Sequence, residues 1–149
     1  MIRKAKSSDL AQLLEIERLC FTSCWTENMF SYEIEENEFG QFYVMEENDK
    51  LIGFIDFWIT FECCQLANIA IDPSYQGQGK SKELMDLMVE QANEAYCENI
   101  MLEVRPSNTK ARKLYETYDF IEINRRKGYY NDNGEDAIIM CKALGGNWV

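Results

Sequence analysis

The spacing of apolar residues divides the first half of the chain into a strand, two helices and three further strands. Apolar positions three and four apart predict a helix that ends at about Cys20, after a short strand over 2–5. We expect Ser7 or Ser8 to cap this helix and Thr26 to cap a short second helix. The three strands are predicted over 41–47, 51–60 and 64–72, the first two joined by a turn at 48–50.

The second half of the chain alternates helices with strands. The pattern predicts a helix from Ser81 to about Tyr96, a strand over 99–104, a helix over 108–118 and two strands that end at about Ala143. Two strand–helix–strand crossovers of this kind call for locally parallel strands with helices packed on them. The first half and the end of the chain have the pattern of antiparallel meanders. We therefore predict an α/β fold with one mixed central sheet, antiparallel in its N-terminal part.

Length and composition limit the kind of protein. With 149 residues, of which 46% are hydrophobic, we expect one domain over 1–144 and a flexible tail over 145–149. The sequence has no run of about 18 apolar residues, and its first ten residues lead directly into charged sequence, so we expect neither a membrane span nor a secretory signal. The six cysteines lack paired C-x-x-C spacing, which favours reduced thiols in a cytoplasmic protein.

Charge and the absence of one residue type narrow the chemistry. The net charge of −11 disfavours direct nucleic-acid binding and favours a cationic partner, although solubility alone also accounts for it. The chain has no histidine, which removes Ser-His-Asp and Cys-His catalytic groups and most zinc sites. We therefore expect no metal, and acid–base chemistry that uses Glu, Asp, Tyr, Lys, Cys or water.

The segment YQGQGKS (75–81) contains the G-K-S tripeptide that ends a nucleotide-binding P-loop. That motif requires a glycine five positions before Gly79, and Ser74 stands there. The loop also comes past the middle of the chain, whereas nucleotide-hydrolysing P-loops usually follow the first strand. We therefore favour a simpler phosphate site, built from a strand, a glycine-bearing turn and a helix N-terminus.

In such a site, the backbone N–H groups of 76–82 converge on a pyrophosphate, and the dipole of the following helix adds positive charge. Gly77 and Gly79 let the backbone approach a ligand without a Cβ in the way. Lys80 and Lys82 lie nearby as charge partners. A glycine pair before a helix is weak evidence for a phosphate site by itself, so the interpretation depends on the surrounding sequence.

Two residues later in the chain have side chains suited to proton transfer. Glu103 lies on a predicted apolar strand, on the face opposite to positions 100, 102 and 104, and a buried acid there must be paired, protonated or functional. Tyr115 shares one helix face with Asn108 and Ala111. The alternatives are a strand-end glutamate that reaches solvent and a tyrosine of the core.

Four separated segments, together with the order of elements, resemble the GCN5-related N-acetyltransferase (GNAT) family. They are CFTSCWTENMF, NIAIDPSYQGQG, LEVRPSNTKARKLY and RRKGYYNDNGEDAIIM, and they resemble more narrowly the RimI-type bacterial enzymes over about 2–144. The family's loop, Gln/Arg-x-x-Gly-x-Gly/Ala, matches Gln76 and Gly79 and, less well, Ser81. Two further departures are Gly77, where a basic residue is common, and Asp119, which replaces a glycine at a helix C-terminus where positive φ is often needed.

The resemblance implies the GNAT fold, with helices on both faces of the sheet, and acetyl-CoA as the co-substrate. It implies that the cofactor contacts are Ile69, Ala70, Ile71, Gln76, Gly77, Gln78, Gly79, Lys80, Ser81, Lys82 and Asn108. The first three would offer backbone groups to the pantetheine and the acetyl carbonyl, and the loop residues would hold the pyrophosphate. Glu103 is implied as general base and Tyr115 as general acid.

The resemblance also implies acetylation of the N-terminal alanine of a small-subunit ribosomal protein, with its basic N-terminal peptide as partner. An α-amine, with a pKa near 8 against about 10.4 for lysine, is the easier nucleophile for a site with one Glu and no His. Candidate walls of a peptide groove are Trp25, Tyr129 and Tyr130, with Glu33, Glu35, Glu135 and Asp136 as possible acidic contacts. The alternatives are an acetyltransferase for a small amine or polyamine, and a non-catalytic acyl-CoA-binding module.

Overall fold

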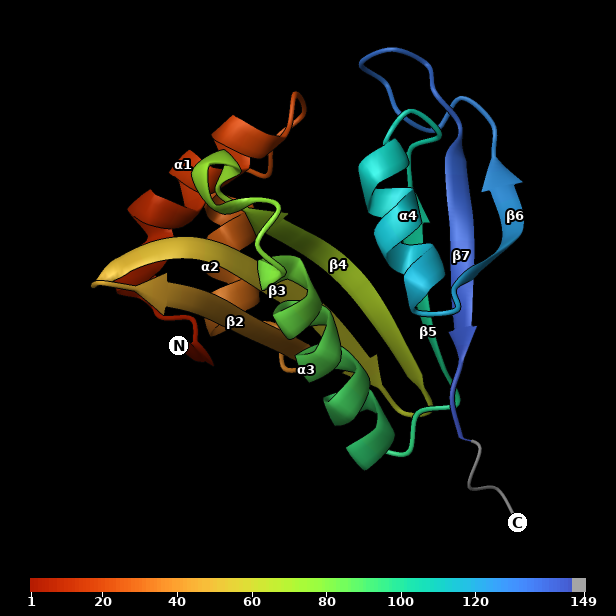
Figure 1. Cartoon of the computed structure of the whole chain (residues 1–149), viewed down its shortest axis with the longest axis horizontal. Helices are drawn as coiled ribbons and strands as arrows, with labels where there is room; N and C mark the ends of the chain where they lie inside the picture. The colour runs from red at the N-terminus through yellow and green to blue at the C-terminus, as the bar shows by residue number, and fades with distance from the viewer. Residues whose placement is uncertain (146–149) are drawn as a thin grey trace.

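A computed structural model describes residues 1–145 and shows one seven-stranded sheet with helices packed on both of its faces (Figure 1). The strands are β1 (Ile2–Lys4), β2 (Gly40–Glu47), β3 (Lys50–Thr60), β4 (Cys63–Ile71), β5 (Asn99–Val104), β6 (Ile121–Arg126) and β7 (Ala137–Ala143). The helices are α1 (Leu10–Cys20), α2 (Glu27–Glu35), α3 (Lys80–Glu94) and α4 (Thr109–Thr117), with 3₁₀ turns at Ser7–Asp9 and Pro73–Tyr75. The predicted α/β class and the order of the elements are confirmed.

The order of strands across the sheet is β1-β2-β3-β4-β5-β7-β6. Strands β1 to β4 form an antiparallel meander, and β4 and β5 form the parallel pair. The expectation of two parallel crossovers is met by β4–α3–β5 and is wrong for β5–α4–β6, because β7 lies between β5 and β6 and is antiparallel to both. Burial explains this order. β7 carries buried Ala137, Ile138 and Met140 and takes the inner place, whereas every residue of β6 is exposed, as suits an edge strand.

The sheet separates two apolar clusters. Helices α1 and α2 cover one face, where Leu13, Phe30 and Phe54 are fully buried. Helices α3 and α4 cover the other face, where Leu84 and Met88 pack on the strands. Strand β3 is buried over most of its length because helices lie on both sides of it, which is why its sequence is apolar rather than alternating.

Local signals at the element ends are only partly as predicted. The Thr26 hydroxyl accepts from the Met29 N–H at 3.2 Å and caps α2, as predicted. The prediction of a serine cap for the first helix is wrong, because Ser7 and Ser8 lie in a 3₁₀ turn before α1. The side chain that stabilises this turn is Asp9, which accepts from the Lys6 N–H at 2.8 Å.

The helix of the central crossover starts close to the predicted residue and ends earlier. α3 spans Lys80–Glu94, and Tyr96 follows it in the left-handed region, with φ of 59°. Of the predicted flexible tail over 145–149, residues 146–149 lie outside the described residues. Within the part that is described, no helix has the length and apolar character needed to cross a membrane.

Candidate active site

The candidate site is a cleft that opens where β4 and β5 stop pairing. Their ladder joins only Cys63–Gln65 to Asn99–Met101, and beyond it the two strands diverge (Figure 1). The register between β3 and β4 shifts so that Ala67 is an extra residue, a β-bulge at the point of divergence. A cavity of about 810 Å³ fills the opening. The free edge of β4 thus faces this cavity, and Ile69, Ala70 and Ile71, predicted as backbone contacts, all line it.

The loop between β4 and α3 has the conformation that its glycines allow. Gly77 and Gly79 have φ of 79° and 78°, a region that other residues adopt at a cost, and Gly79 is the N-cap of α3. Within residues 1–145, no acceptor bonds the backbone N–H groups of 77–82. These six consecutive donors lie at the positive end of the α3 dipole, and such an arrangement binds anions.

The loop residues contribute to the cavity unequally. Gln76, Gly77, Lys80 and Ser81 line it, whereas Gln78, Gly79 and Lys82 are outside its lining. The Lys80 ammonium lies 3.4 Å from the Glu47 carboxylate. The Lys82 carbonyl accepts from the Tyr118 hydroxyl at 3.0 Å.

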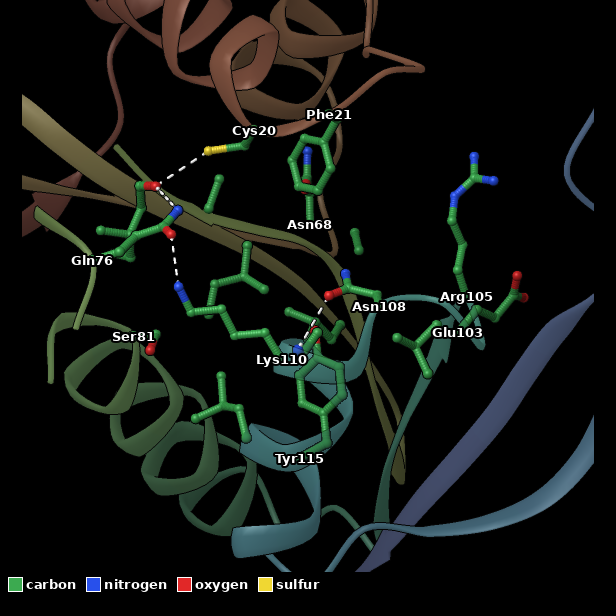
Figure 2. A pocket seen from close by; sticks show the side chains of 18 of the residues that line it. Cys20, Phe21, Asn68, Gln76, Ser81, Glu103, Arg105, Asn108, Lys110 and Tyr115 are labelled. Atoms are coloured by element: carbon green, nitrogen blue, oxygen red, sulfur yellow. Dashed lines mark hydrogen bonds between the residues drawn. The ribbon is translucent and has the colours of Figure 1, made fainter. Parts of the chain in front are cut away.

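The side chain of Gln76 bonds to protein atoms. Its Nε2 donates to the Ile71 carbonyl at 2.9 Å, and its Oε1 accepts from Lys110 Nζ at 2.9 Å (Figure 2). The Cys20 thiol, whose pKa burial raises to about 11, donates to the same Ile71 carbonyl at 3.2 Å. The Gln76 side chain therefore positions the loop, and the amides that follow it remain available.

Tyr115 and Asn108 reach the cavity from α4. The side-chain oxygen of Asn108, Oδ1, caps the helix by accepting from the Ala111 N–H at 3.2 Å (Figure 2). The Nδ2 of the same side chain remains as a donor beside the cleft. Tyr115 is only 6% exposed, and burial, followed by the neighbouring Tyr130, raises the pKa of its phenol above the ordinary value. The phenol therefore stays protonated at neutral pH, as a proton donor must.

Glu103 lies at the junction of two cavities. It lines the cleft and also a second cavity of about 620 Å³ on the α2 side. The strand alternates as predicted, because positions 100, 102 and 104 are buried. The side chain of Glu103 is 24% exposed and 3.9 Å from Arg126 Nη2, so it is less buried than the sequence indicated. In Figure 2 its carboxylate lies apart from the Tyr115 phenol.

The second cavity is aromatic and acidic. Its lining residues include Trp25, Tyr32, Glu33, Trp58, Glu103, Tyr129 and Tyr130. Of the acids considered from sequence, Glu33 lies here. The other three make contacts within the protein: Glu35 accepts from Ser7, Glu135 from Ser107, and Asp136 from the Gly128 N–H. Tyr32 and Trp58 were missed, because their separate elements carry no motif that brings them together.

Arg105 was also missed as a residue of the site. It lines the cleft, and its guanidinium bonds Asp132 at 2.8 Å and lies 3.9 Å from the centre of the Tyr130 ring. Through these contacts Arg105 holds the connection between β6 and β7, residues 127–136, next to the end of β5. The segment LEVRPSN was the available signal, since it places an arginine two residues after Glu103.

A buried pair of carboxyl groups lies beneath the second cavity. Asp56 is fully buried, and within the described chain neither of its oxygens has a hydrogen-bond donor. Burial, and then the nearby Glu33, raise the pKa of Asp56 to about 10. Glu33 itself accepts from Trp58 Nε1 at 2.6 Å and from Asn37 Nδ2 at 3.0 Å. Asp56 is thus neutral at physiological pH, while Glu33 is held by two donors.

Comparison with known proteins identifies the family. A family model described as the acetyltransferase (GNAT) family matches residues 10–120. The chain belongs to this family. GNAT enzymes are acyltransferases that use acetyl-CoA, and the open strand edge and the free amides of this chain fit such a cofactor. Among residues 1–145, no cluster of three or more His, Cys, Asp or Glu side chains could hold a metal ion.

Relatives of this GNAT chain match it over nearly its full length. A Bacillus subtilis protein named putative ribosomal protein bS18-alanine N-acetyltransferase is 39% identical over 93% of this chain and 92% of that protein. The Escherichia coli K12 ribosomal protein bS18-alanine N-acetyltransferase is 32% identical over 94% and 95%. The predicted family resemblance is therefore confirmed.

Solved structures confirm the GNAT fold. The crystal structure of the Escherichia coli ribosomal-protein-S18-alanine N-acetyltransferase superposes with a TM-score of 0.89 and 30% identity, over 100% of this chain and 97% of that one. The structure of yncA from Salmonella typhimurium with its cofactor acetyl-CoA superposes with a TM-score of 0.79 over 100% and 96%; at 19% identity it supports the fold alone.

Proposed function

We propose that this GNAT chain is an acetyl-CoA-dependent N-α-acetyltransferase that acetylates the N-terminal alanine of ribosomal protein bS18 in the cytoplasm, with 1–144 as its single catalytic domain. The observation that carries the proposal is the position of Glu103, which lines both the cleft on the β4 edge and the acidic aromatic cavity. A donor on one side and an amine on the other would meet at this carboxylate. The names of the bS18-specific relatives support the choice of acceptor.

The donor side is proposed to use the cleft between β4 and β5. The backbone of 69–71 would hold the pantetheine and the acetyl carbonyl, and Asn108 Nδ2 would hold a further polar group. The amides of 77–82 would hold the pyrophosphate, without that of Gln76, which donates to the Pro73 carbonyl at 3.4 Å. When bound, acetyl-CoA supplies the thioester whose acyl group is transferred. Alignment of the two reactants in a fixed cleft contributes much of the acceleration.

Glu103 and Tyr115 are proposed to manage the two protons of the reaction. Glu103 would accept the proton of the amine, directly or through one water, because it faces the acceptor cavity. Tyr115 would hold a proton on its Oη for the departing sulfur, a role supported by its raised pKa and its place in the cleft. An α-amine, with a pKa near 8, needs less help than lysine to lose its proton.

The acceptor is proposed to be a basic peptide that enters through the second cavity. Aromatic rings and a carboxylate provide cation–π and ionic contacts for a positively charged residue beside the reacting amine. The net charge of −11 favours the approach of such a peptide and opposes that of nucleic acid.

The decisive experiment uses the full chain with acetyl-CoA and a peptide that copies the N-terminus of bS18. Mass spectrometry should show a product heavier by one acetyl group, placed on the α-amine by fragmentation. The same peptide with its N-terminus already blocked is the control and should remain unchanged. Tight acetyl-CoA binding without any product would contradict the proposed acceptor.

A small polyamine is a second candidate acceptor, because the acidic aromatic cavity also suits a chain of ammonium groups. It would use the same donor cleft, so a panel containing spermidine and the bS18 peptide separates the two. Acetyl-CoA binding without turnover of any amine in the panel would instead indicate a non-catalytic acyl-CoA-binding module.

A further inference from the structure

Lys110, the second residue of α4, reaches across the mouth of the cleft to the loop on the other side. Its Nζ donates to Gln76 Oε1 at 2.9 Å, and Gln76 Nε2 donates to the Ile71 carbonyl at 2.9 Å. Figure 2 shows this chain of two hydrogen bonds, which joins α4 to the end of β4. The lysine therefore bridges the two walls that diverge at the cleft.

The charge of Lys110 is less compensated than that of the other cations in the cleft. Three cationic side chains line it, those of Lys80, Arg105 and Lys110. Lys80 pairs with Glu47 at 3.4 Å, and Arg105 pairs with Asp132 at 2.8 Å. Among residues 1–145, Lys110 has no carboxylate oxygen within 4.0 Å, and its partner is a neutral amide oxygen. Of these three cations, Lys110 is thus the one without a carboxylate partner, and it is available to an anion.

The loop on the opposite side of the cleft from Lys110 also has groups that can bind an anion. Loop 76–82 lies there, with backbone N–H groups from Gly77 onward that have no acceptor in the described chain. We propose that Lys110 binds a phosphate group of the acyl-CoA donor from the α4 side, exchanging its bond to Gln76 for a charge-assisted bond to phosphate. The phosphate carries a negative charge, whereas the Gln76 oxygen is neutral, so the exchange adds an attraction between opposite charges and is favourable. This inference rests on the proposed use of acetyl-CoA.

The test measures acetyl-CoA binding by titration calorimetry with Lys110→Met, which keeps an aliphatic stem and removes the charge. Lys113→Met is the matched control, because Lys113 is exposed on the same helix and outside the cleft lining. A lost bond to a charged group is expected to raise the Kd about tenfold or more for Lys110→Met. The Kd of the control should remain within about twofold.

A salt series separates a phosphate contact from a merely structural bridge. The Kd of the wild type should rise more steeply with ionic strength than that of Lys110→Met, because the variant has lost a charged contact. Lys110→Gln retains a group that can bond Gln76, and it should bind as weakly as Lys110→Met. Wild-type affinity in Lys110→Gln would show that only the bridge matters, which would overturn the proposal.

Shortened donors show which phosphate is involved. Acetyl-dephospho-CoA lacks the 3′-phosphate and acetyl-pantetheine lacks all phosphates. If Lys110→Met still weakens the binding of acetyl-dephospho-CoA, Lys110 contacts the pyrophosphate. If it no longer weakens that binding, Lys110 contacts the 3′-phosphate. An equal weakening with acetyl-pantetheine overturns the inference. If the wild type binds acetyl-CoA normally and Lys110→Met binds it equally well, the inference about Lys110 is overturned and the proposed function is not. If the wild type fails to bind acetyl-CoA, the proposed function is overturned.

Discussion

At the scale of single residues, environment distinguishes the acids and phenols of this chain. Glu103 stays partly exposed at the junction of two cavities, whereas Tyr115 is buried in a way that keeps its proton. Asp56 is fully buried beside Glu33 and is held neutral. These three groups thus differ in their chemistry because water reaches them to different degrees.

Replacing Glu103 with Gln should lower kcat by about 100-fold, because an amide cannot accept the proton of the amine. The loss should be largest near pH 7, where an α-amine is mostly protonated, and smaller above about pH 9. Initial rates with the bS18 peptide across this pH range provide the measurement. Glu98→Gln, an exposed residue just before β5, is the control and should keep the wild-type rate. A wild-type pH profile for Glu103→Gln would remove Glu103 as the base.

Replacing Asp56 with Asn should change how stability depends on pH. The pKa of Asp56 is about 10 in the folded protein against an ordinary 3.8, so between these values only the folded state binds the proton. The free energy of unfolding should therefore fall by up to about 1.4 kcal/mol per pH unit as pH rises through this window. Asp56→Asn removes this slope and should be more stable than the wild type in alkali.

Urea unfolding between pH 6 and 9 measures this effect. Asp49→Asn is the matched control, because Asp49 is exposed in the β2–β3 turn, and it should keep the wild-type slope. Parallel pH profiles for the wild type and Asp56→Asn would contradict the assignment of a neutral Asp56.

At the scale of elements, the end of α4 helps to place Tyr115. The Asp119 N–H donates to the Glu116 carbonyl at 3.0 Å and the Phe120 N–H to the Tyr115 carbonyl at 3.2 Å, which is a Schellman motif. The rings of Tyr115 and Phe120 complete it at 5.9 Å. The motif requires a left-handed residue, and Asp119 has φ of 68°, as its departure from the family's glycine led us to expect.

Asp119→Gly should therefore stabilise the protein by about 0.5–1 kcal/mol, because glycine adopts positive φ without a Cβ clash. Thermal or urea unfolding measures the change. Glu116→Gly, in the last turn of the same helix, should instead destabilise the protein by up to about 1 kcal/mol. Loss of stability in both variants would show that strain at Asp119 is not significant.

At the scale of the whole molecule, the sheet has two parts, which a short parallel ladder between β4 and β5 joins. Strands β1 to β4 meet β5, β7 and β6 through three residue pairs, and the remaining length of β4 faces the cleft. The bridge from Lys110 to Gln76 connects the two walls a second time. A cleft between two parts of one sheet is open to a long cofactor along the edge of a strand, while both apolar clusters stay covered.

The acidic charge of the whole molecule should appear in the salt dependence of peptide use. Raising the salt from about 0.01 M to about 0.15 M shortens the Debye length from about 30 to about 8 Å, so KM for the basic bS18 peptide should rise several-fold. Steady-state rates at saturating acetyl-CoA measure KM. A peptide with its arginines replaced by neutral residues is the control, and its KM should change little. Equal salt effects on both peptides would contradict electrostatic attraction.

Much of the fold follows from local patterns. The apolar spacing predicted every helix and strand in order, and Thr26 and the β2–β3 turn were correct because caps and tight turns depend on a few adjacent residues. The cap of α1 was wrong because Asp9, itself held by Arg3 at 2.9 Å, competes with the serines. The inner place of β7 was also missed, since strand order depends on partners far apart in the sequence.

The sequence by itself determined the family, the glycines of the loop and the two residues proposed for proton transfer, because motifs keep residue types at set spacings. Only the tertiary structure decided which groups are still free to act. It showed that Gln76 is bonded within the protein, that Asp56 and Glu33 are buried together and that Lys110 crosses the cleft. Burial and pairing arise from contacts between distant segments, and no local pattern encodes them.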